Sequence, residues 1–139
     1  PFKTRIFGWE DYVKGNVTVS SENVGSKLDS ILKKAKLVVV PLKENRESGQ
    51  FTIIHAFEAG IPVIATDTDC MKDYIENGVN GFILPNSKNE WLEKINMLYN
   101  DDQLYYNMSN NCKRIYKNNH TQNALGRNVG EVIKNMLEP

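Results

Sequence analysis

The residues best suited to chemistry gather in one polar loop and in the first turn of the segment behind it. The loop runs from Lys43 to Gln50 and reads KENRESGQ. Gly49 has no Cβ, so the backbone there can approach a ligand closely. A helix starting at this point would offer unpaired N–H groups, Ser48 could cap it, and Arg46 adds a fixed positive charge. The loop therefore predicts an anion site, and a diphosphate is the expected ligand.

Two apolar segments flank this loop and the helix behind it. Leu37–Leu42 and Pro62–Thr66 are nearly unbroken apolar runs, as expected of strands buried on both faces of a parallel sheet. Gln50–Ala59 is apolar on most of its surface and predicts a helix that ends at Gly60. In open α/β sheets, ligands bind outside the carboxyl ends of the strands. The polar loop lies at such an end.

The rest of the chain continues the alternation of strands and helices. Further strands are expected at residues 16–21 and 81–84, and further helices at 25–36 and 71–76. From Ser87 onward the chain is expected to be helical, and Ser87 with Glu90 forms the pattern of a capping box. This order predicts a Rossmann-like, doubly wound parallel sheet in a three-layer α/β/α domain, with strands 37–40 and 62–66 at its centre. The C-terminal helices should pack on one side of the sheet or reach beyond the domain. Their apolar stripes are residues 91/95/98, 104/108/112/115 and 125/129/132/136.

Composition excludes several classes of protein. The chain has 139 residues, the size of one domain, with 17 basic and 17 acidic residues. This balance gives no electrostatic footprint for nucleic acid. No apolar run approaches the roughly 18 residues of a spanning helix. Cys70 and Cys112 match no metal-ligand spacing and predict free thiols in a reducing, cytoplasmic compartment.

Residues 47–67, ESGQFTIIHAFEAGIPVIATD, resemble the family 4-like GT-B glycosyltransferases, also called group 1 glycosyl transferases. The family pattern is an acid, a glycine-containing loop, an apolar helix with a second glutamate, and Gly-x-Pro-Val-Ile-Ala. Residues 73–84, DYIENGVNGFIL, stand where the family has E-x-V-x-x-G-x-x-G-x-x-V. The resemblance is strong over residues 37–84 and continues to about Tyr99.

The resemblance implies roles for individual residues. Glu47 would be the catalytic first acid of the family's E-x7-E pair and would contact hydroxyls of the donor sugar. The second acid, which binds the ribose hydroxyls in the family, is replaced here by His55, and an imidazole lacks the bidentate acceptor geometry of a carboxylate. Glu58, three residues on, could substitute for that acid or orient the imidazole. The expected donor-binding residues are Arg46, Ser48, Gly49, Gln50, Phe51, Thr52, His55 and Glu58.

The resemblance also implies an activity. The chain would be the donor-binding domain of a retaining hexosyltransferase that uses a UDP- or GDP-linked sugar, without cofactor or metal, in polysaccharide or glycolipid synthesis. Residues 1–139 would form one partial domain; the N-terminal acceptor-binding domain and the start of the donor domain would be missing, so the fragment is expected to be inactive. The full enzyme would be cytoplasmic, and peripheral contact with the inner face of the membrane stays open. A GT-B-fold sugar-nucleotide epimerase and a non-catalytic flavodoxin-like binding or signalling domain remain alternatives.

Two substitutions express these expectations. Gly49→Val should abolish nucleotide binding and leave the fold intact, because the new side chain would fill only the ligand's approach path. If His55 faces the ribose, His55→Glu should tighten nucleotide binding by about five- to thirtyfold, because it restores the bidentate acceptor. If the site is built around the imidazole, or His55 is packed in the core, the same change should lower binding or stability.

Overall fold

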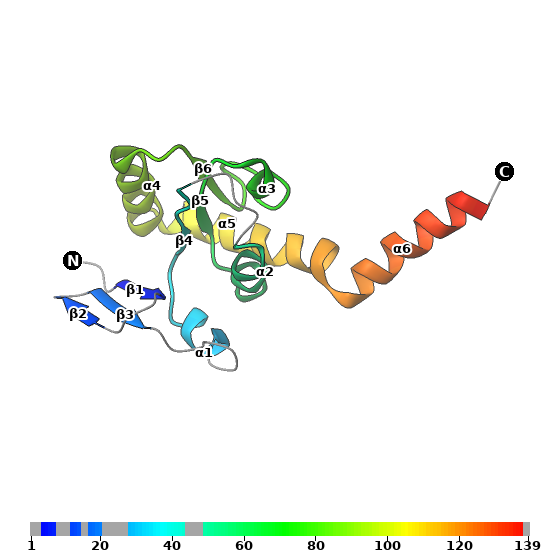
Figure 1. Cartoon of the computed structure of the whole chain (residues 1–139), viewed down its shortest axis with the longest axis horizontal. Helices are drawn as coiled ribbons and strands as arrows, with labels where there is room; N and C mark the ends of the chain where they lie inside the picture. Colours follow the sequence, from blue (N-terminus) through cyan, green and yellow to red (C-terminus); the bar gives the residue numbers. More distant parts are fainter. Residues whose placement is uncertain (1–3, 8–11, 15–16, 21–27, 44–48, 138–139) are drawn as a thin grey trace.

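A three-stranded parallel sheet with helices on both faces forms the centre of the molecule (Figure 1). The computed structural model describes residues 4–7, 12–14, 17–20, 28–43 and 49–137. The strands are β1 (Thr4–Phe7), β2 (Tyr12–Lys14), β3 (Val17–Ser20), β4 (Val38–Val40), β5 (Val63–Thr66) and β6 (Gly81–Leu84). The helices are α1 (Leu28–Leu32), α2 (Gln50–Ala59), α3 (Asp69–Lys72), α4 (Lys88–Asn100), α5 (Asp102–Ile115), the π-helix η2 (Tyr116–His120) and α6 (Gln122–Leu137).

The central strand, β5, explains why the sequence there is apolar without a break. All four of its residues are buried, and alternate side chains enter two different cores. The first core lies toward α1, α2 and α3, and the second lies toward α4 and the start of α5. The doubly wound α/β fold expected from the sequence is therefore confirmed. Buried members of the first core include Val40, Ile53, Ala56, Phe57, Val63, Ala65, Met71 and Cys112, and those of the second are Ile64, Phe82, Leu84, Leu98 and Met108.

The placement of two strands differs from the expectation. The order of the described sheet is β4-β5-β6, so β4 is an edge strand rather than a central one, and its Val39 is 42% exposed. Residues 17–20 form a strand as expected, but β3 pairs with β1 in parallel and with β2 antiparallel in a separate sheet. Because β1 and β2 occupy both edges of β3, neither edge pairs with β4.

Helix ends also depart from the expectation in two places. The short helix after β5 covers Asp69–Lys72, whereas the apolar pattern predicted a helix over residues 71–76. The helix therefore both begins and ends earlier than expected. Ser87 is the N-cap of α4, but its side chain makes no capping hydrogen bond, so the expected capping box is not formed. The apolar stripes of α4 and α5 enter the two cores as expected.

Helix α6 reaches away from the domain (Figure 1). Ala124, at its start, is its one buried residue, and the apolar stripe 125/129/132/136 is exposed. Of the two placements left open by the sequence, packing on the sheet or extension beyond it, the structure has the second. None of the helices described is both long and apolar enough for a membrane span.

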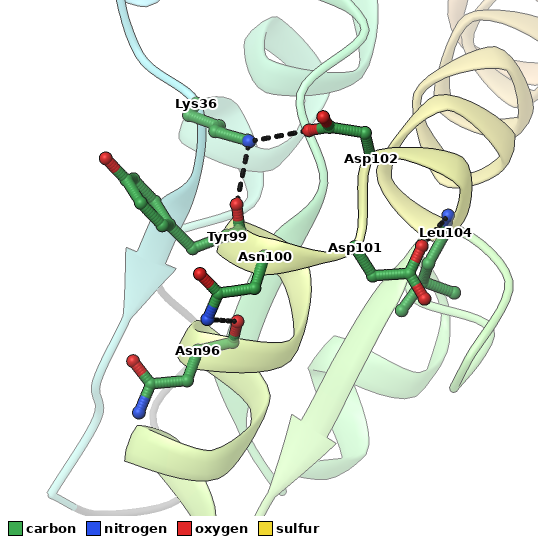
Figure 2. A network of polar contacts seen from close by, with 7 residues as sticks. All are labelled: Lys36, Asn96, Tyr99, Asn100, Asp101, Asp102 and Leu104. Atoms are coloured by element: carbon green, nitrogen blue, oxygen red, sulfur yellow. Dashed lines mark hydrogen bonds and ion pairs between the residues drawn. The ribbon is translucent and has the colours of Figure 1, made fainter.

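Lys36 fastens the segment before β4 to the turn between α4 and α5 (Figure 2). Its Nζ donates to the carbonyl oxygen of Tyr99 at 2.9 Å and to Asp102 Oδ1 at 3.2 Å. The same ammonium lies 5.0 Å from the ring centroid of Tyr99 and 5.3 Å from that of Tyr105. Asp101 caps α5 by accepting a hydrogen bond from the backbone N–H of Leu104 at 2.8 Å. These contacts fix the base of the domain, away from the polar loop.

Candidate functional site

The N-terminus of α2 lies directly behind the polar loop that the sequence singled out. Its N-cap is Gly49, in the left-handed conformation at φ 92°, and not Ser48 as expected. The first helical hydrogen bond joins the N–H of Ile53 to the carbonyl oxygen of Gly49 at 3.0 Å. The amides of residues 50–52 therefore have no acceptor within the helix and form the positive end of its dipole. This is the geometry of an anion site.

Gly49 is required by the core as well as by the loop. A Cβ there would lie 2.7 Å from Cγ1 of Val40 and 3.6 Å from Cε of Met71, and Val40 and Met71 both belong to the first core. A side chain would also have to adopt the positive φ that L residues disfavour. The expectation that Gly49→Val leaves the fold intact is therefore wrong, because position 49 faces Val40.

A polar clasp joins the carboxyl ends of all three strands of the central sheet. Thr66 Oγ1, at the end of β5, accepts from the N–H of Leu42 at 2.8 Å and donates to Asn86 Oδ1 at 3.3 Å. Asn86 Nδ2 in turn donates to the carbonyl oxygen of Leu42 at 3.1 Å. The clasp holds the loops after β4, β5 and β6 together, so the site is built on a rigid edge.

Further contacts connect the starts of α2 and α3. Gln50 Nε2 donates to Sγ of Cys70 at 2.9 Å, and Cys70 is a free, half-buried thiol. Lys72 bridges two carboxylates, with Nζ 3.0 Å from Asp67 and 3.5 Å from Asp69. Its hydrogen bond to Asp67 raises the pKa of the Lys72 ammonium above its usual value. Among the residues described, no three His, Cys, Asp or Glu side chains gather as a metal site.

One face of α2 carries an aromatic ring, an imidazole and a carboxylate in line. Phe51, His55 and Glu58 are spaced i, i+4 and i+7, and so share one side of the helix. The Phe51 ring is 77% exposed, with its centroid 5.1 Å from that of His55. His55 Nδ1 lies 3.6 Å from Glu58 Oε2. A glutamate at position 55 would face the Glu58 carboxylate, and this repulsion opposes the tighter binding expected of His55→Glu.

The structure thus brings together part of the predicted site. The start of α2 holds Gly49, Gln50, Phe51 and Thr52, and the next two turns hold His55 and Glu58. Arg46, Glu47 and Ser48 lie outside the described residues. Thr66, Asn86 and Lys72 were not predicted from the sequence. For Thr66 the available signal was a single hydroxyl at the end of an otherwise apolar strand.

A separate cavity of about 290 Å³ lies between the segment after α3 and the end of α5. Its lining includes Lys72, Tyr74, Glu76, Arg114 and His120, and none of the predicted donor-binding residues that the structure describes. The rings of Tyr74 and His120 stack with centroids 5.7 Å apart, and burial lowers the pKa of His120. The cavity provides an alternative location against which the predicted site can be tested.

Residues 10–115 match the family model described as "Glycosyl transferases group 1". The chain belongs to the group 1 glycosyl transferases. This match includes the loop, α2 and the whole central sheet, and it confirms the resemblance drawn from residues 37–84. A comparison with curated protein sequences finds no match.

Solved structures similar to this group 1 glycosyl transferase chain include three of Anabaena Alr3699/HepE. The complex with UDP-glucose has a TM-score of 0.72 at 20% identity, over 88% of this chain and 33% of that one. The complex with UDP and glucose has a TM-score of 0.72 at 20% identity, over 87% and 32% of the two chains. The complex with UDP has a TM-score of 0.66 at 23% identity, over 76% and 29%. These likenesses support the fold, and this chain spans about a third of the HepE chain.

Proposed function

We propose that this chain binds the sugar donor of a group 1 glycosyl transferase at the carboxyl ends of β4 and β5. The observation that carries the proposal is the start of α2, where Gly49 lets the chain turn and three successive amides lack a helical acceptor. Such an arrangement suits the diphosphate of a nucleotide sugar. Support also comes from the family match and from the UDP and UDP-glucose complexes of the similar HepE.

In this proposal, different residues bind different parts of the donor. The amides of residues 50–52 hold the diphosphate, and the His55 side chain lies nearest the ribose. Glu47 acts on the sugar, in a reaction that retains the anomeric configuration. UDP-linked sugars are the first donors to test, ahead of GDP-linked ones.

The remaining parts of the activity are proposals about the whole enzyme. An N-terminal domain of the same polypeptide would bind the polysaccharide or glycolipid acceptor. The whole enzyme would be cytoplasmic and would contact the membrane peripherally. The present chain would then bind the donor without turning it over. No metal or cofactor is assigned to the reaction.

The two histidines of the chain provide a matched test. UDP-glucose is titrated by calorimetry into the unmodified chain, the His55→Ala variant and the His120→Ala variant. His55→Ala should weaken binding by about two- to tenfold, the effect of one lost hydrogen bond, and His120→Ala should leave it unchanged. In parallel, amide NMR signals of residues 49–52 should shift on titration.

The opposite pattern would refute the location. Weaker binding only in His120→Ala, with signal shifts around Tyr74, would move the nucleotide to the separate cavity. Absence of binding for UDP-, GDP- and ADP-sugars alike would overturn the proposed function of this chain.

A further inference from the structure

Helix α6 is joined to the domain through the π-helix η2. Helix α5 runs directly into η2, and η2 ends at Thr121, whose backbone is extended at φ −85° and ψ 158°. The chain changes direction there, and α6 leads away from the domain (Figure 1). Thr121 Oγ1 accepts from the N–H of Ala124 at 3.2 Å and so caps the start of α6. Because Ala124 alone of the α6 residues is buried, the direction of α6 depends on how η2 is held.

Side-chain contacts hold both ends of η2 against the domain. Tyr116, its first residue, donates from Oη to Glu58 Oε1 on α2 at 2.8 Å. His120, its last residue, lies over Tyr74 in the segment after α3, with ring centroids 5.7 Å apart and ring planes inclined by 19°. Near-parallel rings at this separation form an attractive offset stack. His120 directly precedes Thr121, so the stack holds the residue next to the bend.

The π-helical form of η2 also indicates a joint at this place. π-Helical turns are rare, and they occur frequently at functional sites and at kinks in helices. The hydrogen bond that α6 makes back to η2, from Arg127 Nη2 to the carbonyl oxygen of Asn118, is exposed and, at 3.4 Å, longer than the usual range. Such a contact adds little, so the stack of His120 contributes more to holding α6 in place.

His120 suits this position as a neutral ring. It is half-buried, and burial lowers the pKa of His120 below its usual value of 6.5. The two cations and two carboxylates that line the same cavity balance one another, so the loss of hydration is the main cost of charging the ring. The stack is therefore strongest above pH 6.5 and weakens as the pH falls below that value, because exposure to water then favours the protonated imidazole. The charged and ionisable groups on the elements around the ring are Lys72, Asp73, Tyr74 and Glu76 in and after α3, Arg114 in α5, Lys117 in η2, Glu58 in α2 and Arg127 in α6.

We propose that the stack of His120 on Tyr74 is a latch that fixes the direction in which α6 leaves the domain, and that protonation of the imidazole releases it. In the closed latch the imidazole is neutral and η2 is held at both ends. In the released latch the charged imidazole turns into water, and α6 moves about Thr121. The contact between Tyr116 and Glu58 keeps η2 on the domain, so the apolar face of α6 changes direction while the domain stays folded. The latch does not depend on the donor, and failure of donor binding would leave it untouched.

The direction of α6 is measured as the distance between two spin labels by double electron–electron resonance. The labels are attached to cysteines introduced by Asn107→Cys on α5 and Glu131→Cys on α6, both at exposed positions. Cys70→Ser removes the half-buried thiol, and Cys112 is fully buried. At about pH 7.5 this chain should give one narrow distribution of distances, and at about pH 5 a second population should appear.

Substitutions of the two stacked rings separate the latch from the fold. His120→Ala should show the second population already at about pH 7.5, and His120→Phe, which keeps a ring but carries no charge, should show the narrow distribution at both pH values. Tyr74→Ala should behave like His120→Ala, but it also costs stability, because Tyr74 packs against the first core. The matched control is Tyr106→Ala, which removes an exposed tyrosine ring from α5 and should leave the distances unchanged.

The same narrow distribution in His120→Ala as in the chain with His120 would overturn the latch. A second population at about pH 5 in His120→Phe would mean that another group responds to pH, and would overturn release by protonation of His120. A merely structural role for His120 would lower the urea midpoint of His120→Ala without changing the distances, and this result also contradicts the proposal.

Discussion

Helices α2 and α6 both carry apolar side chains, but only α2 uses them to build the domain. Ile53, Ala56 and Phe57 of α2 are fully buried in the first core. The apolar stripe of α6 is the more regular of the two in sequence, yet Val132 is 58% and Met136 78% exposed. The difference comes from position in the chain. A helix between two parallel strands must return across the sheet, whereas a helix after the last strand has no such constraint.

An amphipathic pattern therefore indicates that a helix has an apolar face suited to burial, but it does not indicate which element covers that face. For α2 the partner is fixed by β4 and β5, which it connects. Of the residues of α6, which the structure describes in full, Ala124 alone is buried. The proposed donor site lies at the start of α2, so the helix that contributes most to the first core would also position the amides proposed to bind the diphosphate.

The largest expected effect comes from removing the bulkiest buried side chain of α2. Phe57→Ala should lower the free energy of unfolding by about 3–5 kcal/mol, through lost burial and the cavity left behind. Met136→Ala, the matched truncation in α6, should change it by less than about 0.5 kcal/mol. Urea unfolding followed by the fluorescence of Trp91, which packs against the second core, measures both. Similar losses in the two variants would mean that α6 is covered in solution.

The next largest effect on stability is expected at Gly49, the N-cap of α2. Gly49→Val should cost about 2–5 kcal/mol, because a Cβ meets Val40 and the positive φ is strained. The same unfolding experiment measures it, and UDP-glucose titration below the unfolding midpoint shows whether binding is lost as well. A variant as stable as the unmodified chain would contradict the packing of Gly49 on the core.

Much of the central domain could be predicted because its patterns are local. The uninterrupted apolar run of β5 correctly predicted burial on both faces, whereas the similar run of β4 did not. Gly60 correctly predicted the end of α2, where it has a left-handed φ of 73°. The anion site at the start of α2 could be predicted for the same reason, since a loop glycine and a following helix are adjacent in sequence, and it stays a prediction. The roles of individual residues, such as Glu47 and His55, came from the family resemblance, because the spacing of apolar residues carries no information about them.

The remainder depended on contacts between distant residues. The pairing of β3 with β1 and β2 cannot be read from the alternation in residues 17–20, which fits either sheet equally. The clasp joins Thr66 to Leu42 and Asn86, 24 and 20 residues away. Tyr116 reaches Glu58 only because η2 packs on α2. Each of these required the three-dimensional arrangement.

The smallest expected effect lies in α6 and has the opposite sign to that of Gly49→Val. Gly130 is an exposed helix-interior glycine without positive φ, and a Cβ there would meet nothing within 4 Å. Gly130→Ala should stabilise α6 against local opening by up to about 1 kcal/mol, because alanine loses less backbone entropy in a helix. Slower amide hydrogen exchange along α6 measures this, while the urea midpoint of the domain should stay unchanged, since α6 contributes little to either core. Gly126→Ala, with equally open surroundings, should act in the same sense. Faster exchange in Gly130→Ala alone would indicate that another surface approaches the helix closely at Gly130, and that α6 is a covered helix like α2 after all.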